Sequence, residues 1–284
     1  MDIGHIAGLF GAGNIISSVK LKSGHINRSF LLDCSGGRYI LQSLNRDIFK
    51  NPEIIAENTE LILKAFSEKP DCGVQIPVFL EHNGSMYLEE NGEIWRMYSY
   101  IEPTGEYSAY MHGFAVGRFL KVLNSGNIKL KVPMKLHEFD LPLPMRNIHG
   151  DTKADNVIFG EPPAVIDLDT ASRGCAFVDF GDMLRSVTSD VFDMQKISAA
   201  VGGFADGVGG LLTDDEINHL YDGTLLIINE LMERYSGGNK HFPNKSPEQC
   251  LERQRQLANQ IGDFRAHEDE ISAIIRTIFG KGSK

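Results

Sequence analysis

The sequence predicts an α+β fold with two lobes: a small N-terminal lobe with an antiparallel sheet and one main helix, and a mainly helical C-terminal lobe. Residues 15–44 alternate apolar and polar side chains, a pattern typical of half-buried strands. The last hundred residues have the texture of helices, and "EPTGE" at residues 102–106 interrupts the chain before the helical part begins. We therefore expect lobes at residues 1–100 and 101–284, with a cleft between them.

The elements of the N-terminal lobe follow from local patterns. Residues 3–10 predict a short amphipathic helix that ends at Gly11. "SGG" at residues 35–37 predicts a hairpin turn between two strands. "NPEIIAENTELILKAF" predicts a helix, with Asn51 as its cap and Pro52 in its first turn. A second hairpin, around "HNGS" and "ENGE", leads into the strand "IWRMYSYI".

The C-terminal lobe reads differently. "AYMHGFAVGRFLKVLN" predicts a helix, and the next segment is irregular with three prolines. Two short strands, "NVIF" and "AVID", flank the turn "GEPP". Two later segments, residues 213–235 and 246–264, each open with a Thr or Ser cap followed by acids, as helices do.

The composition excludes several classes of protein. With 284 residues, 42% of them hydrophobic, the chain can bury a sizeable core, and its net charge of −10 argues against a nucleic-acid or anionic-membrane surface. No apolar run reaches the about 18 residues of a membrane helix, and the N-terminus does not resemble a signal peptide. We expect a cytoplasmic protein with a small-molecule substrate and no nucleic-acid or membrane partner. Its isolated cysteines indicate reduced thiols: Cys34, Cys72, Cys175 and Cys250.

The segment "IHGDTKADNVIF", residues 148–159, carries the chemistry. Asp151 lies at the tip of a turn, Asn156 begins the first short strand, and Asp167 ends the second. Adjacent strands joined by a tight turn place Asn156 and Asp167 near each other. A carboxylate that orients a hydroxyl, together with oxygen ligands for Mg²⁺, is what phosphoryl transfer requires. The spacing H-x-D-x₄-N therefore predicts a phosphotransferase, with Asp151 as base.

On "HGDTKADN" and "AVIDLDT" the chain resembles the kinase-like phosphotransferases that include aminoglycoside phosphotransferases and choline kinases. On "GHIN", "YILQ" and the combination "IDLDT…DFGD" it is most similar to the N-acetylhexosamine 1-kinases. The resemblance implies a bilobal protein-kinase-like fold, ATP as phosphate donor, Mg²⁺, and transfer to the anomeric hydroxyl of an N-acetylhexosamine or hexose. Two alternatives stay open: a kinase of an aminoglycoside, choline or amino alcohol, and a non-catalytic nucleotide-binding relative.

The resemblance also sorts the acids. Asp151 matches the catalytic base, while Asn156 and Asp167 match the metal ligands. Asp169 is expected to contact the metal or the substrate, with a supporting hydrogen bond as the alternative. The literal "DFG" begins at Asp179, and we interpret Asp179 and Asp182 as structural acids in the first turn of a helix.

Two further residues lie beside the predicted base. Lys153 is placed where a cation can meet the γ-phosphate, with a solvated loop lysine as the alternative. His149 is interpreted as a buried scaffold of the loop, because Asp151 already supplies the base.

The nucleotide side is less sharply marked. Backbone amides around Gly24, His25 and Asn27 are predicted to cover phosphates, and Tyr100 and Ile101 to meet adenine at the hinge. There is no G-x-x-x-x-G-K-[ST] motif, which excludes a P-loop enzyme.

Protein kinases carry a phosphate-binding lysine on their third strand. Here Gln42 occupies that place, so we expect the missing charge to come from Arg38, Arg46, Lys153 or the metal. Asn58 and Glu60 are possible partners of Gln42.

The acceptor side departs from the resembling kinases. Tyr235 and Arg253 match their substrate-facing positions, but Glu230 stands where those enzymes carry arginine. Residues 124–147 are also several dozen residues shorter than the corresponding insert of those enzymes. The sequence therefore leaves the acceptor open.

Overall fold

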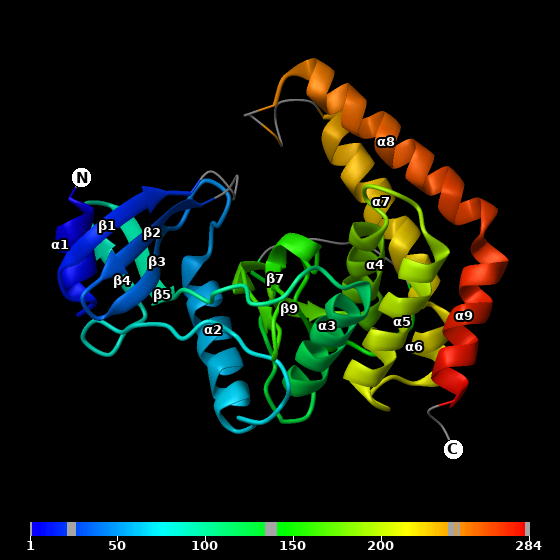
Figure 1. The fold of residues 1–284 in the computed structure, drawn as a ribbon, viewed down its shortest axis with the longest axis horizontal. Coiled ribbons are helices and arrows are strands. Elements are labelled where there is room, and N and C mark those ends of the chain that lie inside the picture. Colours follow the sequence, from blue (N-terminus) through cyan, green and yellow to red (C-terminus); the bar gives the residue numbers. More distant parts are fainter. Residues whose placement is uncertain (1, 22–26, 134–140, 238–241, 243–244, 282–284) are drawn as a thin grey trace.

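A computed structural model describes residues 2–21, 27–133, 141–237, 242 and 245–281 of the chain. Figure 1 shows the sheet at one end of the molecule, the C-terminal helices at the other, and α2 between them. The α+β architecture with an antiparallel sheet in its N-terminal part is confirmed.

The sheet has the order β1-β2-β3-β5-β4, and every neighbouring pair is antiparallel. Its strands are β1 (Ile15–Lys20), β2 (Arg28–Cys34), β3 (Gly37–Ser43), β4 (Tyr87–Glu90) and β5 (Glu93–Ser99). The predicted turn at 35–37 joins β2 to β3, where Cys34 pairs with Gly37. Helix α1 (Ile3–Leu9) covers a small core that the sheet shares with it, which includes Ile6, Phe10, Leu32, Leu41, Trp95 and Met97.

Helix α2 (Pro52–Ser67) packs against the C-terminal lobe. Its residues Ile62, Ala65 and Phe66 belong to the large core, and Phe66 contacts Phe119 with ring centroids 5.6 Å apart. Asn51 is the N-cap residue, but its side chain makes no capping hydrogen bond and donates to the Pro133 carbonyl at 3.3 Å instead. Asn51 therefore occupies the predicted N-cap position, but the capping hydrogen bond is absent, because its side chain bonds the Pro133 carbonyl instead.

The C-terminal lobe contains short strand pairs and packed helices. β6 (Arg146–Ile148) pairs with β9 (Ser172–Gly174), and β7 (Val157–Ile158) pairs with β8 (Ala164–Val165). The helices are α3 (Ala109–Leu123), α4 (Ala176–Val187), α5 (Met194–Val208), α6 (Asp214–Asn218), α7 (Leu220–Ser236), α8 (Pro247–Ala266) and α9 (Glu268–Lys281).

Two features of these helices bear on the sequence predictions. The predicted helix over 213–235 is divided at His219 into α6 and α7. Capping boxes at Thr213 and Ser246 confirm the two predicted helix starts.

None of the helices in the described ranges has the length and apolar character needed to span a bilayer.

Candidate active site

Asp179 holds the loop that carries Asp151 through hydrogen bonds to the loop backbone. Strand β6 ends at Ile148, and Gly150 turns the chain with a φ of 82° that favours glycine. The backbone N–H groups of His149 and Gly150 each donate to the Asp179 carboxylate at 2.8 Å. Asp179 therefore stabilises the loop as a structural acid in the first turn of α4, as predicted, whereas Asp182 lies one turn further along the helix.

His149 is fully buried, as the scaffold interpretation requires. Its Nε2 lies 2.9 Å from the Ile166 carbonyl, which ties the loop to the end of β8. Its ring packs edge-on against Phe119, with centroids 5.3 Å apart. The loop is thus held between the large core and the segment that leads to Asp167.

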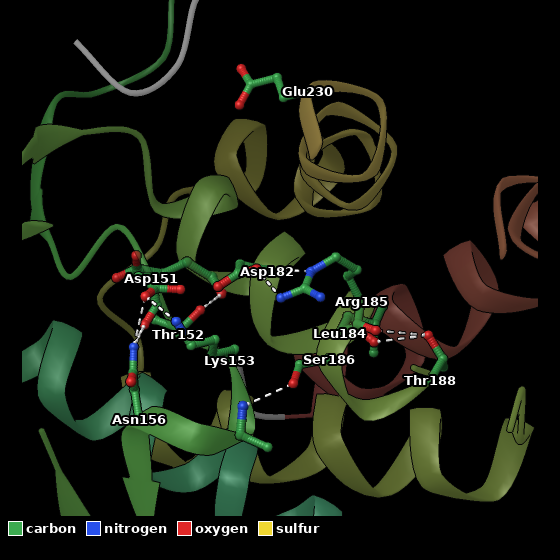
Figure 2. A network of polar contacts seen from close by, with 12 residues as sticks. Asp151, Thr152, Lys153, Asn156, Asp182, Leu184, Arg185, Ser186, Thr188 and Glu230 are labelled. Atoms are coloured by element: carbon green, nitrogen blue, oxygen red, sulfur yellow. Dashed lines mark hydrogen bonds and ion pairs between the residues drawn. The ribbon is translucent and has the colours of Figure 1, made fainter. Parts of the chain in front are cut away.

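Asp151, Lys153 and Asn156 converge on one another (Figure 2). The Asp151 Oδ2 atom accepts from Lys153 Nζ at 2.6 Å and from Asn156 Nδ2 at 2.9 Å. Asn156 also donates to the Asp151 carbonyl at 2.8 Å. Asn156 ends a 3₁₀ turn, η1 (Ala154–Asn156), rather than beginning a strand, and this turn directs its carboxamide back toward Asp151.

Asp167 lies beside this group. The Ile166 N–H donates to the Asn156 carbonyl at 2.9 Å, so the two segments are adjacent, as the hairpin argument predicted. Asp167 has a left-handed backbone, with φ 62° and ψ 63°, which is uncommon for a non-glycine residue. Its side chain is exposed to solvent.

The surroundings of Asp167 change its chemistry. Desolvation by the surrounding protein, together with the charges of Asp169 and Asp151, raises its pKa to about 6, while Arg96 and Lys153 oppose the rise. Carboxylates that repel one another in this way are stabilised by a cation. This observation fits Mg²⁺, with Asp167 and Asn156 as protein ligands.

The donor set suits a cation that also binds phosphate. Among the described residues there is no cluster of three or more His, Cys, Asp and Glu side chains that encloses a metal by itself. Mg²⁺ commonly takes one or two carboxylates and completes its shell with water and substrate phosphates. One carboxylate and one carboxamide beside Asp151 match that mode of binding.

Gln42 does not use the partners suggested for it. It donates to Ser29 Oγ at 2.9 Å and accepts from Arg96 Nε at 2.8 Å. Asn58 instead donates to the Lys131 and Ala171 carbonyls at 2.9 and 2.8 Å. Helix α2 is turned toward the C-terminal lobe, so Asn58 serves as its anchor there.

Arg96 is the residue that sequence reasoning missed. It lies opposite Gln42 in the pairing of β3 with β5, so both side chains occupy the same face of the sheet. The guanidinium is 3% exposed and forms an ion pair with Asp169, whose Oδ2 lies 2.9 Å from Nη2. The available signal was an arginine inside an otherwise apolar strand, "IWRMYSY".

Asp169 differs from its predicted role. Its side chain is 1% exposed, both oxygens accept from Arg96, and Oδ2 also accepts from Asn27 Nδ2 at 2.8 Å. In this arrangement Asp169 presents no exposed oxygen to a substrate. It makes the supporting hydrogen bonds that were the alternative.

The rest of the predicted nucleotide site is partly described. The Asn27 carboxamide bonds Asp169 and accepts from the Asn45 N–H at 3.0 Å, while Gly24 and His25 lie outside the described residues. At the hinge, the Tyr100 N–H donates to the Arg38 carbonyl at 3.0 Å, and Ile101 follows directly.

Arg38 and Arg46 are directed elsewhere. Arg38 Nε lies 2.7 Å from Asp33, and its guanidinium stacks on the Tyr100 ring with 4.8 Å to the centroid. Arg46 lies 3.3 Å from Glu89. Both occupy exposed positions with acidic partners, so neither lies beside Gln42 as a free charge. The cation that does lie beside Gln42 is Arg96, which is buried and paired with Asp169.

The predicted acceptor residues, Tyr235 and Arg253, lie near Arg185. Tyr235 is buried and stacks on Phe242, with ring centroids 4.0 Å apart. Burial and the charge of Arg185 lower the pKa of Arg253, and Arg253 in turn moderates the burial-raised pKa of Tyr235, so these groups are neighbours.

The Asp182–Arg185 ion pair, 2.6 Å long, lies next to the Asp151 group in Figure 2, whereas Glu230 lies apart from it on α7. Glu230 has an ion-pair partner in Arg234, at 3.7 Å. Residues 134–140 of the shortened segment are outside the described part, so its predicted effect on the acceptor side stays a prediction.

Comparison with known proteins agrees with this geometry. Residues 131–209, which contain Asp151, Asn156 and Asp167, match the model of the "Phosphotransferase enzyme family". A microcompartment-associated aminopropanol kinase has a similar structure, with a TM-score of 0.64 and 14% identity over 95% of this chain and 99% of that chain. A choline kinase from Streptococcus pneumoniae gives 0.60 and 12%, over 91% and 98%.

A third similar structure is a spectinomycin phosphotransferase in complex with ADP and spectinomycin. Its TM-score is 0.57 and its identity 11%, over 97% of each chain. At such identities the likeness shows the fold alone. The fold is the protein-kinase-like fold of these phosphotransferases, as predicted.

Proposed function

We propose that this protein is a kinase of a small molecule, which transfers the γ-phosphate of ATP to a hydroxyl group of its acceptor. The proposal rests on the convergence of Asp151, Lys153 and Asn156 beside Asp167. Asp179 holds the loop that carries Asp151 in place. The match of residues 131–209 to a phosphotransferase family supports it.

Each residue has a step to perform. Asp151 accepts or orients the proton of the acceptor hydroxyl, and its Oδ1 takes none of the hydrogen bonds found among the described residues. Lys153 holds the other oxygen and offers its charge to the γ-phosphate. Asn156 and Asp167 would hold Mg²⁺, which neutralises charge on the β- and γ-phosphates when it is bound.

For the acceptor we propose a sugar, an N-acetylhexosamine or hexose phosphorylated at its anomeric hydroxyl. The support is the resemblance of "GHIN", "YILQ" and the combination "IDLDT…DFGD" to hexosamine 1-kinases, together with Tyr235 and Arg253 on the acceptor side. An anomeric hydroxyl is more acidic than an ordinary alcohol, which suits a carboxylate base.

A cationic acceptor is the second candidate. The net charge of −10 and the acidic Glu230 favour an amine-bearing alcohol. The similar structures include an aminopropanol kinase, a choline kinase and a spectinomycin phosphotransferase.

A panel of acceptors separates these candidates. N-acetylglucosamine, N-acetylgalactosamine, galactose, aminopropanol, choline and spectinomycin are each incubated with ATP and Mg²⁺, and ADP release is measured. Phosphorus NMR of the product identifies the phosphorylated position. Turnover with amines but not with sugars would contradict the sugar proposal. Retained binding of Mg·ATP without turnover of any acceptor would indicate a non-catalytic relative.

Asp151→Asn tests the proposed base. We expect kcat to fall by about 10²–10⁴-fold, since general-base catalysis contributes that much, while Mg·ATP binding by calorimetry is kept. Asp155→Asn is the matched control, because Asp155 is an exposed acid four residues away on the same loop. Near-full activity of Asp151→Asn would show that another group is the base.

A further inference from the structure

A buried polar cluster joins three segments around the metal side of the site. We define the Arg96 cluster as Arg96, Asp169, Asn27, Gln42 and Ser29. Arg96 binds Asp169 through both terminal nitrogens and Gln42 through Nε, Asn27 donates to Asp169, and Gln42 donates to Ser29. Every member thus contacts another through a side-chain hydrogen bond.

The cluster links segments that the proposed reaction must hold in register. Asp169 lies two residues after Asp167, in η2 (Leu168–Thr170), the turn that Asp167 begins with its left-handed backbone. Asn27 is the last of the residues predicted to cover phosphates. Arg96 and Gln42 belong to the neighbouring inner strands β5 and β3. The Arg96–Asp169 pair therefore joins the sheet to the turn that follows Asp167 and, through Asp169, to Asn27.

Stability alone is a weak explanation for such a pair. Removing two charges from water costs several kcal/mol per ion, and well-packed apolar residues of similar volume are often as stabilising as a buried ion pair. What the bidentate pair gives is geometry, because two parallel hydrogen bonds fix both the distance and the orientation of the Asp169 carboxylate.

The cluster also crosses between the two hydrophobic cores. β3 and β5 contribute Leu41, Trp95 and Met97 to the small core under α1, whereas Leu168 beside Asp169 belongs to the large core. An ion pair at this junction fixes the position of the sheet relative to the C-terminal lobe.

We propose that Arg96 is a positioning residue for the nucleotide and metal side of the site. Through Asp169 it fixes the turn that presents Asp167, and the same Asp169 carboxylate holds Asn27, at the end of the predicted phosphate-covering segment. In protein kinases a lysine on the third strand helps to hold the phosphates in place. Here we infer that Arg96 has a comparable effect through its hydrogen bonds to Asp169, without touching the phosphates itself. This inference rests on the proposed kinase function.

The expected effect is selective. Partners that orient a metal ligand typically change metal affinity or activity by about 10–100-fold when they are removed. Arg96→Met/Asp169→Asn removes both charges and leaves a carbonyl oxygen that can accept from Asn27. We expect its Kd for Mg·ATP and its half-saturating Mg²⁺ concentration to rise about tenfold or more, while the KM of the acceptor changes less than about twofold.

The chain offers a matched control. Arg146 and Glu216 form another ion pair between β6 and α6, with a Nη2–Oε2 distance of 2.7 Å, in which the glutamate is buried and the arginine is 19% exposed. Arg146→Met/Glu216→Gln removes the same two charges without touching the Arg96 cluster. We expect it to change the urea midpoint of unfolding but not the Kd for Mg·ATP.

Arg96→Lys provides a graded variant if the double variant does not fold. It keeps the charge but loses the bidentate geometry, so an intermediate Kd for Mg·ATP is expected. Each variant is measured by calorimetry with ATP at several Mg²⁺ concentrations, by steady-state kinetics and by urea unfolding.

The outcomes separate this inference from the function it rests on. Equal effects of the two double variants on unfolding, with Kd for Mg·ATP unchanged in both, would overturn the positioning role and leave the kinase proposal standing. A wild-type protein that binds Mg·ATP but phosphorylates no acceptor would overturn the kinase proposal, while the Kd comparison would still decide the role of Arg96.

Discussion

At the scale of single residues, the same side chain does different work according to what it faces. Four aspartates lie within sixteen residues, Asp167, Asp169, Asp179 and Asp182, and each has different surroundings. Asp167 reaches solvent beside Asp151, Asp169 pairs with Arg96, Asp179 accepts from the loop backbone, and Asp182 pairs with Arg185. The literal "DFG" therefore belongs to the support of the site.

His112 gives a residue-scale prediction about pH. It is fully buried in α3 with Nε2 2.7 Å from the Thr152 carbonyl, and burial lowers its pKa to about 4. The unfolded chain has a histidine pKa of about 6.5 and so binds the proton first as pH falls. Stability should therefore drop between pH 6.5 and pH 4, by about 2 kcal/mol at pH 5 from this residue alone.

The measurement is urea unfolding at pH 7.5 and pH 5 for the wild type and His112→Gln, which keeps a donor near Thr152. The variant should lose about 2 kcal/mol less than the wild type on acidification. If His112→Gln lost as much stability as the wild type between pH 7.5 and pH 5, the acid sensitivity would belong to other groups.

At the scale of elements, glycines allow helices to touch through their backbones. A Cβ on Gly203 of α5 would lie 1.9 Å from the Tyr110 carbonyl of α3, and a Cβ on Gly113 of α3 would lie 2.0 Å from the Ala200 carbonyl of α5. The same holds for α4 and α7, where a Cβ on Gly181 would lie 2.3 Å from Gly223. The glycine of the "DFG" triplet is thus a helix-contact residue.

Two neighbouring glycines of α5 should respond oppositely to alanine. Gly203→Ala should destabilise the protein by about 2 kcal/mol or more, because the backbone of α3 must move away. A Cβ on Gly202 would meet no atom within 4 Å, so Gly202→Ala should stabilise the protein by about 0.5–1 kcal/mol through helix propensity. Urea unfolding measures both, and equal effects would contradict the close contact.

At the scale of the whole molecule, the two cores do not coincide with the boundary expected at residue 100. The small core contains residues of α1 and the sheet, whereas α2 contributes Ile62 and Phe66 to the large core. Asn58 adds hydrogen bonds from α2 to the Lys131 and Ala171 carbonyls. Helix α2 thus packs with the C-terminal lobe, although in the sequence it lies between strands β3 and β4.

Hydrogen exchange tests this division. In native-state exchange at increasing urea, the amides of α2 should open with those of α3, since elements that share a core open as one unit. Mass spectrometry of peptides from residues 52–67, 109–123 and 28–43 gives the three exchange profiles. If α2 opened together with β2 and β3 at lower urea than α3, the assignment of α2 to the large core would be wrong.

The sequence by itself predicted the two-lobed α+β fold and the group of Asp151, Asn156 and Asp167. These features depend on patterns within short stretches: alternation in a strand, a cap, a turn between two strands. Residues within a stretch of about twenty have few ways to meet, so spacing alone placed them together.

Only the tertiary structure decided the partners of polar groups that are far apart in the chain. Arg96 and Asp169 are separated by 73 residues, and Asn27 and Asp169 by 142. Alternation predicts which face of a strand a side chain occupies, but not which segment of the other lobe packs against that face. The pairing of Arg96, the anchoring of Asn58 and the work of Asp179 therefore required the assembled fold, because long-range packing determines which buried polar groups meet.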